Sequence, residues 1–436
     1  MVEKHNREGG GRPLSYEILD AKDSEGGRIK SRLIEMPGGR PIKTEHGPQW
    51  LHADVRKGAA PNALLPHVQQ AGIELIPDSM PRIFYKRGQP VRYNGKIQLI
   101  NKARGLIDDY KGPDTDLASF FATQSLGTET ALSTTFGPVE TGAPLHEVST
   151  HDVRELVACN MGAFTRQGLS QFAGHYARDI KKHIRTNCPI TEVHWKLEGR
   201  EGGMVKTASG DTYFAKRIVL SPSVGVLKSG DIKFVPPLPP KHQHSLDNVH
   251  MGNFNKVFLV FNRDFTIPVN ANTHMDVETR GGHEIFYLAK DNGQQLVTAF
   301  FGGELAQLCD RDPNAARDIA INGLAEIWGE GARTAIQRDK CVVTQWGNDP
   351  YVKGGYSRVN IGHHEARQQL AEPIGDVLYL AGEAMGTIHP ETGRNWATHM
   401  TGAAISGERA GNAVVKSLAK KETVGAPGGG FAQRVR

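Results

Sequence analysis

The sequence has few cysteines and no long apolar run. Four cysteines occur in 436 residues, far apart and without CxxC spacing: Cys159, Cys188, Cys309 and Cys341. This argues against a disulfide scaffold and gives no sign of a metal site, so we expect reduced, mostly buried thiols and no bound metal. No stretch of 18 apolar residues is present, which argues against a transmembrane helix.

The charge is also unremarkable, because 52 basic and 47 acidic residues are spread along the chain without a long basic block. A nucleic-acid partner is therefore disfavoured. The first 15 residues, MVEKHNREGGGRPLS, are polar and glycine-rich, unlike a signal peptide. We expect a cytoplasmic protein with a small-molecule substrate and no nucleic-acid or membrane partner.

One early segment, YEILDAKDSEGGRI, looks like half of a nucleotide-binding unit. It reads as a short strand with Asp20 at its carboxyl end, followed by Gly26, Gly27 and Arg28. In a dinucleotide-binding fold such an acidic side chain accepts hydrogen bonds from a ribose. A strand, a G-x-G-x-x-G turn and a helix should precede it and would need roughly 30 residues. Only 15 precede Tyr16, so the phosphate turn is absent from this sequence.

Three explanations of this absence stay open. The chain is a fragment, another chain supplies the segment, or the protein is a variant with weakened or absent cofactor binding. A lost segment could also have carried an export signal. Without the turn, the central strand of the nucleotide-binding sheet is missing too, which would leave an exposed edge.

The rest of the chain reads as a mixture of helices and strands. Residues 97–185 look mainly helical, including the segment DVRELVACNMGAF, and strand patterns follow in segments such as NKVFLVF and QQLVTAFFGG. The segment DPNAARDIAINGLAEIWGEG reads as a helix capped by Asp312 and Pro313 and ended by Gly329. A strand and a helix rich in small residues close the fold.

Three ordered motifs carry a resemblance. They are the segment that begins IVLSPSVGVLKSGDIKF, the segment QWGNDPYVKGGYS, and LYLAGEAMG with the following HMTGAAISGERAG. Together they resemble the flavin-containing amine oxidases, the family of monoamine oxidases, polyamine oxidases and lysine-specific histone demethylases.

The resemblance implies an α/β fold with a Rossmann-like FAD-binding domain made of discontinuous segments, its first strand and GxGxxG turn missing, and an inserted α+β substrate-binding domain. We expect the FAD-binding domain at 1–55, 186–248 and 360–420, the substrate-binding domain at 56–185 and 249–359, and a disordered tail at 421–436.

Lys256 is the main catalytic candidate. It lies at the start of an otherwise apolar strand, where a lysine is costly to bury without polar partners. The resemblance implies that it holds a water against flavin N5 and assists reoxidation; an exposed lysine at a strand edge is the alternative.

Two side chains are expected to line opposite sides of the substrate pocket. The resemblance makes Tyr356 one wall of an aromatic cage over the flavin, with ordinary core packing as the alternative. The opposite wall maps to His399, although Trp396 is near enough in sequence to replace it. Gly355 stands where monoamine oxidases carry the cysteine that binds flavin covalently, so FAD should be non-covalent here.

The resemblance also implies a set of cofactor contacts. Glu383 would accept hydrogen bonds from ribityl hydroxyls, and the amino end of the helix that follows would face the flavin pyrimidine. His52 would line the substrate tunnel, or equally be a surface residue. The full cofactor set is Asp20, Lys22, Gly26, Gly27, Arg28, Gln49, Trp50, Val193, Pro222, Trp346, Tyr351, Gly382, Glu383 and Met400.

These residues favour a FAD-dependent amine oxidase that passes hydride from the α-carbon of an amine to flavin N5, giving an imine or aldehyde and, with O2, hydrogen peroxide. A homodimer is possible. The alternatives are a cofactor-deficient member that acts as a binding or scaffold protein, and an L-amino acid oxidase, for which only Arg56 offers a distant carboxylate partner. The loop MGTIHPETGRNWAT is a candidate specificity element.

Overall fold

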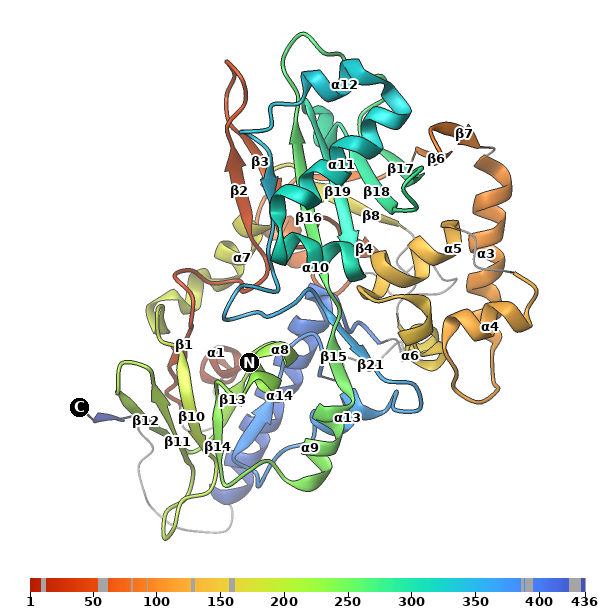
Figure 1. The fold of residues 1–436 in the computed structure, drawn as a ribbon. Helices are drawn as coiled ribbons and strands as arrows, with labels where there is room; N and C mark the ends of the chain where they lie inside the picture. Colours follow the sequence, from red (N-terminus) through yellow and green to blue (C-terminus); the bar gives the residue numbers. More distant parts are fainter. Residues whose placement is uncertain are drawn as a thin grey trace. The chain divides into compact units, whose positions relative to one another are not determined.

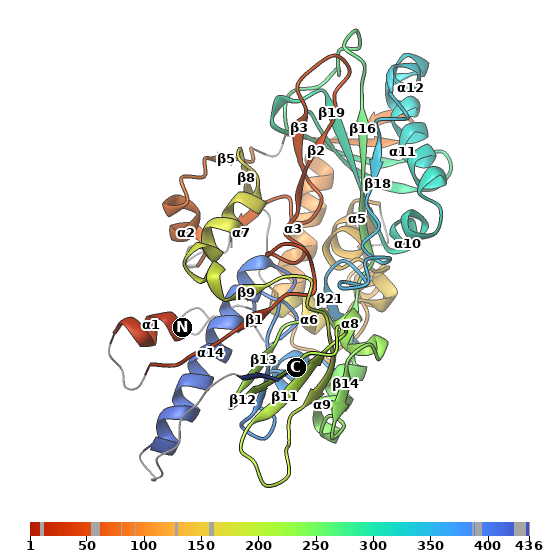
Figure 2. The ribbon, with the colours of Figure 1, turned by 90° about the vertical axis from the view of Figure 1, so that its left-hand side faces the viewer.

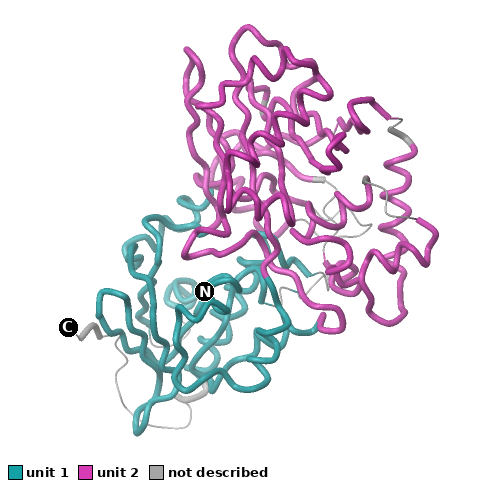
Figure 3. Tube along the Cα trace, in the orientation of Figure 1, with its two compact units in different colours: residues 1–27, 172–250, 365–436 teal, residues 28–171, 251–364 magenta. Residues whose placement is uncertain are grey.

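The computed structural model of the 436-residue chain forms two compact units (Figure 3). Unit 1 comprises residues 1–27, 172–250 and 365–436, and unit 2 comprises residues 28–171 and 251–364. The structure describes residues 1–8, 13–53, 62–79, 81–91, 93–126, 130–156, 161–385, 388, 395–422 and 433–435. Both units are discontinuous in sequence. Residues 28–55, which the sequence analysis grouped with the nucleotide-binding segments, lie in unit 2.

Unit 1 contains two separate pairs of parallel strands. Strand β1 (Ile18–Leu19) pairs with β9 (Ile184–Arg185) (Figure 2), and β13 (Ile218–Leu220) pairs with β22 (Leu378–Leu380). No strand in the described part of the chain joins the two pairs. The edge of each pair therefore lacks the further partner that a continuous parallel sheet would have.

The remaining strands of unit 1 form a five-stranded sheet in the order β14-β10-β11-β12-β23. Their bounds are β10 Ile190–His194, β11 Gly203–Thr207, β12 Thr212–Ala215, β14 Lys233–Val235 and β23 Gln433–Val435. Part of the predicted disordered tail, residues 423–432 and 436, lies outside the described residues. The helices of this unit are α1 Val2–Arg7, η3 Arg178–His183, α8 Val224–Ser229, α9 Pro240–Asp247, α13 Ala366–Leu370 and α14 Met400–Glu422.

Unit 2 is built on a seven-stranded sheet in the order β20-β16-β19-β18-β17-β6-β7, of which Figure 1 labels β16 to β19, β6 and β7. Its strands are β6 Arg82–Lys86, β7 Gln89–Val91, β16 Phe254–Val260, β17 Thr273–Glu278, β18 Glu284–Ala289, β19 Leu296–Gly302 and β20 Val342–Val343. All neighbours pair antiparallel except β17 and β6, which are parallel. The central strands are buried along nearly their whole length, because both faces of the sheet are covered.

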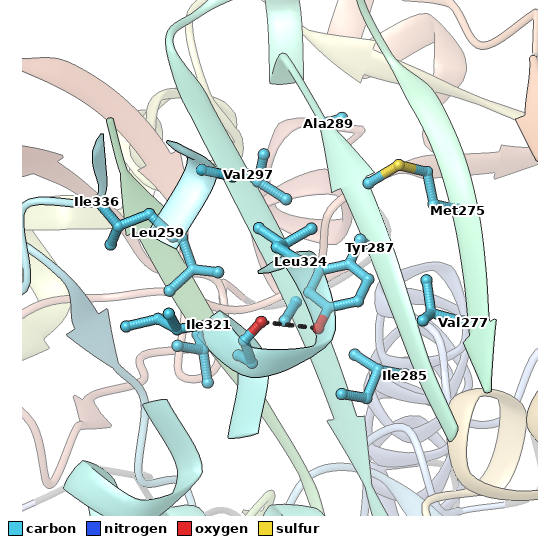
Figure 4. Close-up of a cluster of buried hydrophobic side chains, with 14 of the residues drawn as sticks. Leu259, Met275, Val277, Ile285, Tyr287, Ala289, Val297, Ile321, Leu324 and Ile336 are labelled. Carbon is cyan, nitrogen blue, oxygen red and sulfur yellow. Dashed lines mark hydrogen bonds between the residues drawn. The ribbon is translucent and has the colours of Figure 1, made fainter. Parts of the chain in front are cut away.

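Helices α10 (Gly303–Arg311) and α11 (Pro313–Trp328) pack on one face of this sheet. Their buried residues join a cluster with alternate residues of β16 to β19, and Tyr287 donates a hydrogen bond to the Ala320 carbonyl at 2.8 Å (Figure 4). The predicted helix limits are confirmed: the Asp312 side chain caps α11, and Gly329 ends it with a φ of 81°. The opposite face carries the alternate set, including Phe258 and Phe300.

The predicted helical region consists mainly of helices but contains one error. Helix α6 (Thr150–Glu155) ends early, and β8 (Met161–Thr165) is the middle strand between β4 (Leu51–Ala53) and β5 (Leu75–Pro77). A short apolar run fits a buried strand or a helix equally well. The other helices of unit 2 are α2 Leu65–Gln70, α3 Tyr93–Asp109, α4 Leu117–Thr123, α5 Thr130–Thr134, η1 Thr135–Val139, η2 Leu145–Glu147, η4 Asp291–Gly293 and α12 Glu330–Ala335.

Four further strands and one helix complete the described elements: β2 Ser31–Ile34, β3 Ile42–Glu45, β15 Val249–Met251, β21 Ser357–Val359 and α7 Leu169–Ala177. Among the described residues, no helix is both long and apolar enough to cross a membrane. Cys188, Cys309 and Cys341 are free thiols, as predicted, and Cys159 lies outside the described residues.

Candidate functional site

Lys256 is buried in unit 2, with 2% of its surface exposed. It lies on the face of β16 that does not meet α10 and α11, and its ammonium is 5.1 Å from the centre of the Phe300 ring. Its Nζ donates hydrogen bonds to the Glu45 carbonyl at 2.6 Å, the Gly47 carbonyl at 2.8 Å and Gln49 Oε1 at 2.9 Å. The alternative of an exposed strand-edge lysine is therefore wrong.

A buried chain of polar side chains continues from this lysine. The Gln49 amide accepts from Lys256 through Oε1 and donates through Nε2 to Asp291 Oδ2 at 2.8 Å. Burial raises the pKa of Asp291 to about 6, although Gln49 and Lys256 oppose the shift. Burial lowers the pKa of Lys256 to about 7, against the pull of Glu45 and Asp291. Both groups thus change charge near neutral pH.

Tyr356 and Trp346 are held by backbone carbonyls of unit 2. The Tyr356 hydroxyl donates to the Val139 carbonyl, and its ring lies 5.2 Å from that of Phe254. Trp346 Nε1 donates to the His46 carbonyl at 3.0 Å. Tyr351, from the same segment, is 41% exposed. The orientation of the Tyr356 ring is therefore fixed from both its hydroxyl and its face.

Gly355 has no room for a side chain. A Cβ built on it would lie 2.7 Å from Phe254 Cβ, which is closer than real Cβ atoms come, and at a tight 3.2 Å from the Gly252 carbonyl oxygen. The adjacent Arg28 donates from Nη1 to the Gly355 carbonyl at 2.5 Å. A cysteine could not occupy this position without a shift of β16.

Trp50 belongs to a second buried polar group in unit 2. Its Nε1 donates to Asp78 Oδ2 at 2.9 Å, and the same carboxylate oxygen lies 2.9 Å from His274 Nε2. Its ring stacks on Phe300 at 5.6 Å, beside the Lys256 ammonium. His52, one strand position beyond Leu51, is half-buried and lies 6.0 Å from the Trp50 ring.

In unit 1, strand β22 leads into Gly382 and Glu383. Ser406 of α14, fully buried, accepts from Gly382 N and donates to Gly382 O, both at 2.8 Å, so it fixes the helix against the strand end. Gly382 has a φ of 129°, which favours glycine. The buried Glu383 carboxylate accepts from Thr398 N at 3.0 Å.

Trp396 and His399, the two candidates for the second wall, are neighbours in unit 1. Their rings lie 6.0 Å apart and nearly perpendicular, and only 3% of the Trp396 surface is exposed. His399 Nδ1 is 2.8 Å from the Ala397 carbonyl. Met400 begins α14 immediately afterwards. The loop preceding them, including residues 386–387 and 389–394, lies outside the described residues, as does Arg56.

Asp20 lies at the carboxyl end of β1, as predicted. Its Oδ1 accepts from Lys22 N at 2.9 Å, and burial raises its pKa. Gly26 and Gly27 have φ values of 102° and 60°. The other predicted cofactor residues of unit 1 are Val193, fully buried in β10, and Pro222, in the loop between β13 and α8.

The sequence analysis missed the partners of the predicted residues. Glu45 and Asp291 lie outside the quoted motifs, and Ser406 lies inside the motif HMTGAAISGERAG but was not singled out. An isolated carboxylate in a polar segment has no distinguishing sequence pattern. Only Asp291, which follows an apolar strand by two residues, carries a weak signal at a strand end.

Comparison with known proteins identifies the class. Residues 112–415, more than half of the chain, match the family model described as flavin containing amine oxidoreductase. The chain therefore belongs to this family of flavoprotein amine oxidases, in agreement with the resemblance read from its motifs.

Individual relatives fall in two groups. Lysine-specific histone demethylase 1 homolog 3 of Oryza sativa subsp. indica is 26% identical over 422 residues, covering 90% of this chain and 50% of that protein. Polyamine oxidase 2 of Arabidopsis thaliana is 30% identical over 210 residues, covering 48% of this chain and 41% of that protein. The chain thus spans half or less of the length of these two relatives.

Among solved structures, wild-type putrescine oxidase bound to putrescine matches with a TM-score of 0.73 at 17% identity, covering 95% of this chain and 96% of that chain. This likeness confirms the predicted α/β fold class.

Each unit by itself carries residues that suit part of a flavin cofactor. Unit 1 presents a carboxylate at the end of β1, glycines with positive φ after it, and the buried Glu383 at the end of β22. Unit 2 presents a buried cation whose pKa lies near neutral, where it could balance negative charge. The crowding at Gly355 is compatible with a non-covalent cofactor, since no thiol fits there.

Proposed function

We propose that this protein is an amine oxidase with non-covalently bound FAD. It oxidises an amine at its α-carbon to an imine, which water hydrolyses to an aldehyde with release of ammonia or a shorter amine, and it reduces O2 to hydrogen peroxide. A bound flavin would supply the hydride acceptor, at N5. The observation that carries the proposal is Lys256, a buried ammonium that lies over the Phe300 ring and is held by two backbone carbonyls and Gln49. Burying such a charge is costly unless polar groups hold it, which favours a role for the lysine.

Lys256 would bind the water that assists reoxidation. All three of its N–H groups already meet protein oxygens, two of them backbone carbonyls and the third the side chain of Gln49. A side-chain amide can turn away more easily than a backbone carbonyl, so Gln49 is the partner that a water would replace. Asp291 would then be left with one hydrogen bond fewer, which links water binding to its protonation.

The resemblance to the family makes Tyr356 of unit 2 and His399 of unit 1 the two residues beside the amine. The Tyr356 hydroxyl is committed to the Val139 carbonyl, so the residue would offer its ring face and not a proton. An electron-rich ring face favours an amine group through cation–π attraction. Trp396, perpendicular to the His399 ring, would hold that imidazole in place and border the substrate. Asp20, Glu383 and the start of α14 would bind the cofactor in unit 1.

The test is peroxide release by purified protein supplied with FAD. Short monoamines, diamines, polyamines and L-amino acids would be compared at equal concentrations in a peroxidase-coupled assay. The proposal expects turnover of one or more amines and none of the amino acids. Turnover restricted to amino acids would favour the L-amino acid oxidase, and a protein that binds FAD without oxidising any amine would favour a binding role.

A further inference from the structure

Three side chains of unit 2 that play no part in the proposed oxidation gather at one point. They are Asp114, His151 and His364, and one potential ligand atom from each lies within 4.8 Å of the others. They come from three separate segments: the loop before α4, the first turn of α6, and the loop that follows β21. The two imidazole rings are 5.2 Å apart and nearly perpendicular.

Hydrogen bonds orient the His151 ring. Its Nε2 lies 2.8 Å from the Gly112 carbonyl oxygen, which can only accept, so Nε2 carries the proton. Nδ1 of the neutral ring is then a bare lone pair. That atom is buried and has no hydrogen-bond partner. A histidine whose second nitrogen donates to a backbone carbonyl is the arrangement that metal-ligating histidines use.

His364 repeats the pattern. Its Nε2 faces Glu155 Oε1 at 3.7 Å, and its Nδ1 is also buried without a hydrogen-bond partner. Two unpartnered imidazole nitrogens beside a carboxylate are costly in a folded protein, because each has lost its hydrogen bond to water. A cation would satisfy both nitrogens at once.

The third residue of the cluster, Asp114, is ionised. Hydrogen bonds from Gly362 N, His151 N, Ser149 and Thr150 lower its pKa despite partial burial. Its Oδ1 accepts from Thr150 and His151 N, and its Oδ2 accepts from Gly362 N at 2.6 Å; Ser149 Oγ lies within 2.9 Å of both oxygens. The carboxylate thus joins the same loops that carry the histidines and supplies the negative charge.

We propose that Asp114, His151 and His364 form a binding site for a divalent transition-metal ion, zinc or a metal of similar preference. Two imidazoles and a carboxylate suit zinc, with water in the fourth position. Zinc bonds of about 2.0–2.1 Å would place tetrahedral ligand atoms about 3.4 Å apart. The present limit of 4.8 Å therefore requires side-chain movements of about 1 Å. The ion would clamp the three loops together.

The test uses untagged full-length protein, stripped with a chelator and titrated with Co2+, whose visible bands report nitrogen and oxygen ligation. Zn2+ competes in a second titration, and Mg2+, which prefers oxygen ligands, is the negative probe. The substitution is His364→Gln, because among the described residues His364 makes only a long contact to Glu155 and a ring contact with His151, whereas Asp114 joins three segments. His146→Gln is the control, since His146 is 71% exposed.

The proposal expects about one Zn2+ per wild-type chain, Co2+ bands that Zn2+ abolishes, and a higher melting temperature with Zn2+ than with Mg2+. His364→Gln should weaken Zn2+ binding by at least about 100-fold, more than loss of an outer partner, and His146→Gln should not. Absence of Co2+ bands in the wild type, or equal Zn2+ affinity in wild type and His364→Gln, would overturn the site and show that water fills it.

Discussion

Lys256 in unit 2 and Glu383 in unit 1 are both buried charged residues, but the molecule stabilises them in different ways. Lys256 lies near two carboxyl groups, those of Glu45 and Asp291, whose pKa values are both raised. Glu383 accepts a hydrogen bond from the backbone of Thr398, while Ser406 fixes the backbone of neighbouring Gly382. The difference teaches that charge governs the surroundings of Lys256 in unit 2, whereas backbone geometry governs the surroundings of Glu383 in unit 1.

The largest effect should come from Lys256→Met. The change leaves two backbone carbonyls and the Gln49 amide without their donor and removes the cation that opposes Asp291. Breaking a buried charged network in this way costs about 3–5 kcal/mol of folding free energy. Denaturant unfolding of the variant measures the loss, and Lys86→Met, at a 59% exposed lysine, is the control.

The proposed function adds a second readout for the same variant. Stopped-flow mixing with O2 should show slower flavin reoxidation, while reduction by the amine changes less. Reoxidation at the wild-type rate would contradict the role assigned to Lys256.

The pH dependence of folding stability should reveal the charged groups around Lys256 directly. The pKa of Asp291 is about 6 in the folded chain against an ordinary 3.8, so between these pH values the folded state holds a proton that the unfolded state has lost. Stability therefore falls as pH rises from about 4 to about 6, by on the order of 2–3 kcal/mol. For Lys256 the order is reversed, and stability rises with pH between about 7 and 10.5.

Asp291→Asn should reduce the fall between about pH 4 and pH 6, to which Glu45 and Asp20 also contribute through their raised pKa values, while leaving the rise above about pH 7. Melting temperatures across this range are the measurement, and Asp264→Asn, at an exposed position, should leave both limbs unchanged. A wild-type curve that is flat between pH 4 and 6 would show that Asp291 is ionised throughout.

A smaller loss is expected from Gly355→Cys. The new Cβ would come within 2.7 Å of Phe254 Cβ, and such overpacking costs about 1–3 kcal/mol. The control is Gly331→Ala in α12, where a Cβ would meet nothing within 4 Å. Denatured Gly355→Cys protein on a gel should show no flavin fluorescence. A stable variant with covalently attached flavin would contradict the crowding described for this site.

The smallest effect should come from the backbone contacts beside Glu383 in unit 1. Ser406→Ala removes the hydroxyl that bridges Gly382 N and O inside unit 1, and leaving a buried amide unsatisfied costs about 1–2 kcal/mol. This loss should not vary between pH 4 and pH 8, in contrast to the wild-type dependence on Asp291. Glu408→Ala, at an exposed position of the same helix, is the control. A pH-dependent loss would contradict the distinction between the surroundings of Lys256 and those of Glu383.

Part of this account could be read from the sequence and part could not. The pattern NKVFLVF predicts a buried strand with a polar residue that needs partners, and the structure confirms the burial of Lys256. Its partners come from more than 200 residues away in sequence, and no local pattern pairs them with it. The family motifs predicted the class because they carry backbone and cofactor chemistry, whereas Ser406 is one small residue among many.

Local patterns failed where a short segment fits two structures. Residues 161–165 form a strand because β4 and β5 lie on both sides of it, a tertiary effect that outweighs local preference. No sequence pattern indicated the proposed metal site, for a related reason. Asp114, His151 and His364 lie 37 or more residues apart and show none of the short spacings by which metal ligands are recognised.

The absorption spectrum of the purified protein tests the central claim most directly. After incubation with FAD and removal of the excess, the account predicts flavin bands in the visible region that bleach when a substrate amine is added without oxygen and return when air is admitted. A folded protein that stays colourless after FAD is added, or whose flavin bands no amine bleaches, would contradict it.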